Sequence, residues 1–253
     1  MMAKKLLSTM VLLIVVVCVS CSGTSTTLDP AYTRQTVEAV AALRPIGHSD
    51  TEFLQGLVDG TVEGFDTNAY LDVLTHLSVE EGYTLEYSYF LQEDFGGHPI
   101  LHARPQTYGS WAEYIEAEQP DLPEDHSYLV HVVVDGTAEG FFEYVVLEIM
   151  GDQFYLYWHS GANDAEIVYN RARLWEIVKE HPKLPYGAKL RARTLNVTPV
   201  VKVLDDTVVV QVVTFSNWSG FVQQSYTIRR DFAHKVLELE RKTLVEYKTD
   251  VVM

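Results

Sequence analysis

The C-terminal part of the chain constrains the fold most, because four strand-forming runs follow one another there. Between Val197 and Tyr247 the runs are VTPVVKVL, TVVVQVVTFSNW, FVQQSYTIRR and KVLELERKTLVEY. Short turn segments separate them at Asp205-Asp206, Ser219-Gly220 and Asp231-Phe232. β-Branched and aromatic residues favour strands, and turns this short join antiparallel neighbours. The sequence therefore predicts an antiparallel meander.

Two further β regions are predicted upstream of this meander. From Tyr83, YTLEYSYFLQEDF indicates a strand, Gly96-Gly97 a turn, and HPILHARP the returning strand. From Ser127 to His159, SYLVHVVVDG, GFFEYVVLEIMGD and QFYLYWH indicate three strands joined at Asp135-Gly136 and Gly151-Asp152. An Asp-Gly pair favours a two-residue hairpin turn, because both positions tolerate positive φ.

Helices are expected between these regions. Asp29 and Pro30 fit the N-cap and first position of a helix that ends before Pro45. Shorter helices are predicted after residues 66–68, over residues 110–118, and from Asn163-Asp164 to about His181. The secondary structure of residues 51–65 is ambiguous from the sequence.

The order of elements indicates the α+β class, with a curved antiparallel sheet or half-open barrel of meanders and hairpins with packed helices. We expect one domain over residues 29–253. A weak internal repeat relates residues 53–74 to 129–150, because DGTVEGF recurs as DGTAEGF. The alternative interpretation is that both segments are turns of the same chemistry.

Charge and cysteine content argue against a nucleic-acid-binding protein and against a domain stabilised by disulfides. The net charge of −16 is unfavourable for binding nucleic acid. The two cysteines are Cys18 and Cys21, so the rest of the chain folds without disulfides and depends on its core. An apolar content of 47% is ordinary for a globular protein.

Residues 1–20 have the pattern of a secretory signal peptide. Lys4 and Lys5 precede an apolar run from Leu6 to Val19, which is shorter than the ~20 residues that span a bilayer as a helix. Val19-Ser20-Cys21 resembles the lipobox of bacterial lipoproteins, although Cys18 stands where leucine is usual. The alternative is an ordinary signal peptide with Cys21 free.

The resemblance implies that Cys21 is the lipid attachment site. Its thiol would take a diacylglycerol, the chain would be cut before it, and the new amine would be acylated, typically with palmitate. We then expect a lipid-anchored protein at the cell membrane or outer membrane, facing the periplasm or exterior. Ser22 in place of aspartate favours the outer membrane. Residues 21–28 are expected to form a lipidated flexible tether.

Candidate catalytic and metal-binding residues are scattered and weak. Asp94, His98 and His102 surround the Gly96-Gly97 turn, yet on a strand the two histidines would lie about 13 Å apart. His159-Ser160 lacks the elbow motif of serine hydrolases. His126, His131 and the acidic pairs Glu80-Glu81, Glu93-Asp94, Glu124-Asp125 and Asp205-Asp206 are more typical of turns and surfaces.

These observations predict no catalytic residue, metal ligand or cofactor other than the covalent lipid at Cys21. The strands are rich in aromatic residues, which would fill a core and, on a concave face, grip a ligand. We expect a ligand- or protein-binding module of the cell envelope rather than an enzyme. The alternatives are an assembly subunit of an envelope complex and a membrane-tethered hydrolase using residues near Glu93–His102 or His159.

Overall fold

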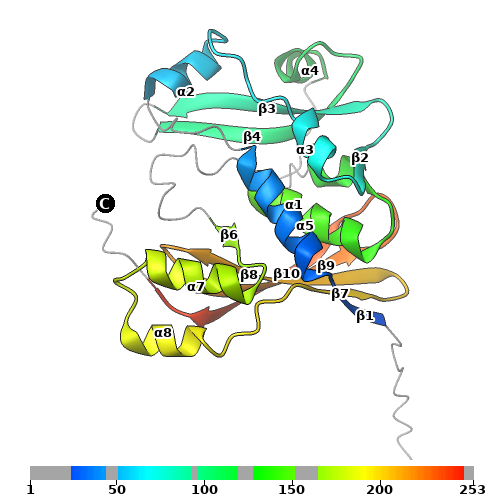
Figure 1. The fold of residues 1–253 in the computed structure, drawn as a ribbon. Coiled ribbons are helices and arrows are strands. Elements are labelled where there is room, and N and C mark those ends of the chain that lie inside the picture. The colour runs from blue at the N-terminus through cyan, green and yellow to red at the C-terminus, as the bar shows by residue number, and fades with distance from the viewer. Residues whose placement is uncertain (1–23, 44–50, 93–95, 119–127, 152–164, 248–253) are drawn as a thin grey trace, which may run out of the picture.

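The computed structural model describes residues 24–43, 51–92, 96–118, 128–151 and 165–247 (Figure 1). Its largest element is a six-stranded antiparallel sheet in the order β1-β7-β8-β9-β10, in which β6 also pairs with β8. The strands are β1 (Thr24–Thr27), β6 (Glu166–Ile167), β7 (Val200–Val203), β8 (Thr207–Ser216), β9 (Gly220–Arg229) and β10 (Val236–Val245). The α+β prediction is confirmed, and within the described residues the sheet stays open rather than closing into a barrel.

The C-terminal meander of β7, β8, β9 and β10 is confirmed. In β8, Val208, Val210 and Val212 are buried in the main core, whereas Val213 and Phe215 belong to a second core cluster. Successive strand residues point to opposite faces. The sheet is therefore covered on one face by the main core and, near the end of β8, on the other face as well.

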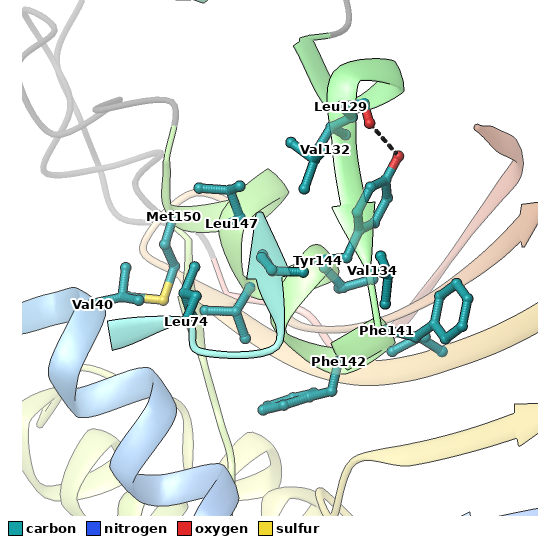
Figure 2. Packing of buried hydrophobic residues seen from close by; sticks show 14 of the residues in the cluster. Val40, Leu74, Leu129, Val132, Val134, Phe141, Phe142, Tyr144, Leu147 and Met150 are labelled. Carbon is teal, nitrogen blue, oxygen red and sulfur yellow. Dashed lines mark hydrogen bonds between the residues drawn. The ribbon is translucent and has the colours of Figure 1, made fainter. Parts of the chain in front are cut away.

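The prediction of a strand over GFFEYVVLEIMGD is wrong, because this segment forms helix α5 (Ala138–Met150). The Thr137 hydroxyl accepts a hydrogen bond from the Gly140 amide at 3.0 Å and caps the helix. Residues 140 to 147 are all buried, so the helix has no polar face to reveal its period. Figure 2 shows the side chains of α5 at the centre of the main core.

The other helices follow the predictions more closely. Helix α1 (Pro30–Ala42) starts as expected, with the Asp29 carboxylate accepting from the Ala31 amide at 2.8 Å. Helices α3 (Asn68–Val73) and α4 (Trp111–Glu118) are also confirmed. Helix α7 (Arg171–Glu180) begins later than predicted, because Asn170 rather than Asp164 caps it. Two further helices are α2 (Thr51–Val58) and α8 (Tyr186–Ala192).

Two small antiparallel pairs complete the described structure. Strands β3 (Tyr83–Gln92) and β4 (Gly96–Pro105) form the predicted hairpin, but Gly96 pairs with Gln92, so both glycines lie within β4. Strand β5 (Val132–Val134) pairs with β2 (Leu77–Val79). The predicted strand from Ser127 is shorter than expected, since Tyr128–His131 is a 3-10 helix. The predicted strand over 153–159 lies outside the described residues.

The elements are stacked in layers (Figure 1). Helices α1 and α5 lie between the large sheet and the β3–β4 hairpin, with α2 and α4 beyond the hairpin. Helices α7 and α8 lie at the end of the sheet opposite the start of β1. The two similar DGT segments differ in context: the first follows α2 and the second leads into α5.

Strand β1 differs from the prediction of a flexible tether before the domain. Thr24–Thr27 pair with Val200–Val203 of β7, and Leu28 is only 1% exposed. The predicted tether of residues 21–28 therefore contains a structured strand. Only residues 22 and 23 separate Cys21 from the sheet.

Candidate functional site

A pocket of about 310 Å³ lies between α1, the end of α5, β6 and α7. Its apolar lining consists of Val37 and Ala41 from α1, Met150 from α5 and Ile167 from β6. Figure 2 shows the Met150 side chain pointing toward α1 beside Val40. Helices α1 and α5 and strand β6 contribute to the main core, and α7 contributes to the second core cluster, so the pocket lies where the two clusters meet.

Arg173 on α7 organises one wall of the pocket. Its guanidinium lies 2.7 Å from Glu166 of β6, 3.1 Å from Glu176 and 3.3 Å from Glu180. Asn170 positions the first turn of α7, since its side chain accepts from the Arg173 amide at 2.9 Å. Burial raises the pKa of Glu166, while the adjacent Arg173 opposes that rise. Burial lowers the pKa of Arg173, but its carboxylate partners outweigh this and keep it above its usual range.

Tyr169 and Glu38 also line the pocket. The Tyr169 hydroxyl donates to the Glu38 carboxylate at 2.7 Å and so links the chain after β6 to α1. Burial, reinforced by this carboxylate, raises the pKa of Tyr169 above its usual range. Tyr169 therefore stays a hydrogen-bond donor at neutral pH.

The lining favours cationic ligands. Glu38, Glu166 and Glu176 supply three carboxylates to the pocket, and Arg173 supplies the one guanidinium among its lining residues. An anionic ligand would have to displace carboxylates that already hold Arg173. An amine would instead gain an opposite charge, and its hydrocarbon part would cover the apolar lining.

A second polar cluster surrounds Glu143 of α5, which is 1% exposed. It accepts hydrogen bonds from the Tyr32 hydroxyl at 2.6 Å and the His76 amide at 2.8 Å. His76 in turn lies 2.7 Å from Asp135, which raises the pKa of its imidazole. Burial raises the pKa of Glu143. These contacts connect α1 and the segment before β2 to α5, which indicates a structural role.

A third polar chain joins α5 to the sheet. The Tyr226 hydroxyl lies 2.7 Å from Glu148 and 2.8 Å from the Gln224 side-chain oxygen. The Gln224 amide donates to Thr214 at 3.0 Å. Burial raises the pKa of Glu148. Glu143 and Glu148 thus tie the central helix to α1 and to β9 respectively.

The described histidines among the predicted candidates do not converge. His102 is 6% exposed, lies 2.8 Å from the Ser88 hydroxyl and stacks on Trp111 at 3.8 Å. His131 lies 2.7 Å from Glu80 and stacks on Tyr83 at 4.0 Å. Each histidine joins neighbouring elements, which is a packing role.

Only some of the remaining candidate residues lie in the described part of the chain. Asp205-Asp206 lie in the turn between β7 and β8, as expected. The side chain of His98 and all of Cys21, Glu93-Asp94, Glu124-Asp125, His126 and His159-Ser160 lie outside the described residues. In the part of the chain that the structure describes, no group of three His, Cys, Asp or Glu side chains is arranged for a metal ion.

Sequence reasoning missed the pocket residues. Arg173 and Glu176 are three apart on a helix, a spacing that puts them in contact and was available from the sequence. The approach of Glu38 to Tyr169 depends on how α1 packs against the segment after β6, which no local pattern encodes.

Among the described helices, none combines the length and apolar character that crossing a bilayer requires. Comparison with models of known protein families, with curated protein sequences and with solved structures found no match to this chain.

Proposed function

We propose that this protein is an exported lipoprotein, anchored through Cys21, whose domain binds a small cationic ligand in the pocket between α1 and α7. The observation that carries the binding proposal is the pocket of about 310 Å³ with an apolar lining and three carboxylates. The N-terminal pattern from Lys4 to Cys21 supports the anchor. The strongly acidic chain, with a net charge of −16, would also attract cations.

The anchor is tested by replacing Cys21 with serine in the full chain expressed in a bacterium. Two or three acyl chains hold a protein on a membrane stably. We expect wild type in the detergent phase with lipid on Cys21. We expect Cys21→Ser to carry no lipid and to keep residues 1–20, because in the expected scheme the cut before residue 21 follows attachment of the lipid. Mass spectrometry of the wild-type N-terminus should show a lipidated Cys21, and an unmodified N-terminus would contradict the proposal.

The pocket is tested with two probes of equal length and opposite charge, hexylammonium and hexanoate. We expect hexylammonium to bind, measured by calorimetry, and hexanoate to give no heat of binding. Glu38→Gln removes one carboxylate while keeping the acceptor for Tyr169. Since an exposed charge contact contributes about 0.2–1 kcal/mol, the dissociation constant should rise by up to about fivefold.

Glu238→Gln on β10 is the matched control, because Glu238 is exposed and lies outside the pocket. It makes the same change of net charge but removes no carboxylate from the pocket. It should therefore leave the hexylammonium affinity unchanged. Equal binding of both probes, or equal weakening by both substitutions, would show that the pocket carboxylates do not select the ligand.

A further inference from the structure

The structure points to one orientation on the membrane: we infer that the sheet end carrying the first residue of β1 faces the bilayer, with Phe232 and Leu237 in its headgroup region. This inference rests on the proposed lipid anchor at Cys21. The partner is therefore a phospholipid leaflet. Two exposed apolar side chains and a short chain path from Cys21 carry the argument.

The chain path limits how far the domain can stand from the anchor. Three residue steps join Cys21 to Thr24, which span at most about 10 Å when fully extended. Thr24 pairs with Val203, the last residue of β7. If Cys21 carries acyl chains in the leaflet, this end of the sheet must lie next to the headgroups.

Two connections between strands share this end of the sheet with Thr24. The turn after Val203 leads back to Val208, and the loop after Arg229 leads to Val236, which pairs with Ile228. Arg230 joins the two connections: its amide donates to Asp206 at 3.0 Å, and its guanidinium donates to the Leu204 and Asp205 carbonyls at 3.4 Å. Residues 204–206 and 229–237 thus form one surface, here called the anchor-side surface.

The anchor-side surface presents apolar side chains to solvent. Phe232 is 47% exposed and Leu237 is 49% exposed. The loop that carries Phe232 is fixed at its base, where the Arg229 amide donates to Lys235 at 2.9 Å. The Tyr144 hydroxyl of α5 donates to the His234 carbonyl at 3.1 Å. A side chain presented by a fixed backbone loses less conformational entropy when it enters a membrane interface.

The charge of this surface also permits contact with lipid. The chain as a whole has a net charge of −16, which anionic headgroups repel. The anchor-side surface instead balances three cations against three carboxylates. They are Arg229, Arg230 and Lys235 against Asp205, Asp206 and Asp231. This end can therefore approach the headgroups without the repulsion expected for the rest of the protein.

The opposite end of the sheet supplies a comparison. Tyr186 of α8 is 76% exposed, and Trp218 in the turn between β8 and β9 is 39% exposed. Helix α8 lies at the end of the sheet away from β1 (Figure 1). In the inferred orientation these side chains stay in water, so Tyr186 is a matched control for Phe232.

The test uses the lipidated full-length protein in vesicles of phosphatidylethanolamine and phosphatidylglycerol. Phe232→Cys, Leu237→Cys and Tyr186→Cys each introduce one thiol for a nitrobenzoxadiazole dye, because the chain has no cysteine after Cys21. Phospholipids with a spin label near the headgroup quench a dye that lies close to them. Circular dichroism of each variant verifies that it is folded.

We expect quenching at positions 232 and 237 to be at least about twofold stronger than at position 186. Equal quenching at all three positions, or stronger quenching at 186, would overturn the inferred orientation while leaving the anchor intact. Failure of wild type to float with the vesicles, together with an unmodified Cys21, would overturn the anchor and the orientation together.

Discussion

Replacing Gly220 with alanine is expected to destabilise the protein by about 4 kcal/mol, a large part of the roughly 5–15 kcal/mol by which folded proteins are stable. Gly220 has a φ of 75°, which an L side chain rarely adopts. A Cβ atom there would lie 2.2 Å from the Val245 carbonyl oxygen and 2.6 Å from the Tyr247 amide nitrogen. Both atoms belong to the backbone of the neighbouring chain segment, so no side-chain rotation can relieve the contact.

Urea unfolding followed by circular dichroism measures this loss. Gly82→Ala is the first control, because Gly82 has a φ of 87° but open space around its Cβ position. It should lose only about 1–2 kcal/mol from backbone strain. Gly187→Ala, with no positive φ and no neighbour within 4 Å, should be neutral or slightly stabilising. Equal losses at Gly220 and Gly82 would show that the close approach to β10 contributes nothing.

Replacing Phe142 with alanine should cost about 3–5 kcal/mol, the range typical of a large aromatic deleted from a core. Phe142 is 0% exposed on α5 and lies near Tyr32 of α1, with ring centroids 6.5 Å apart. Helix α5 contacts α1 on one side and β7 and β8 on another. A cavity at this position therefore weakens several contacts of the core at once (Figure 2).

The same unfolding experiment measures the change, with Phe232→Ala as the matched control. Phe232 is 47% exposed, so the same deletion there should change the stability by less than about 0.5 kcal/mol. A loss at Phe142 no larger than that at Phe232 would mean that α5 does not form the centre of the core.

The prediction from the sequence was most accurate where turn residues and alternating apolar residues indicate the same strands. The meander from β7 to β10 was predicted because Asp205-Asp206 and Ser219-Gly220 interrupt clearly strand-forming runs. Helix α5 was not predicted because it is buried on all sides. Its apolar residues therefore show no helical period, and an apolar run of this kind fits a strand as well as a helix. Strand β1 was missed because its Ser and Thr residues are typical of a linker, and only β7 makes them a strand.

The candidate site was less predictable than the fold. Glu166 and Arg173 approach each other across the junction between β6 and α7, and Glu38 comes from α1. These contacts depend on the packing of elements distant in the sequence. The lipid attachment at Cys21, by contrast, can be proposed only from the sequence, because it lies outside the described residues.

The pairing of β1 with β7 has a consequence for the order of folding. Thr24–Thr27 leave the ribosome long before their partners Val200–Val203, because most of the domain lies between the two segments in the sequence. Contacts between such distant segments form slowly, because a long loop must close before they stabilise anything. The outer edge of β7 therefore stays uncovered until late, and during that interval it is open to pairing with another chain.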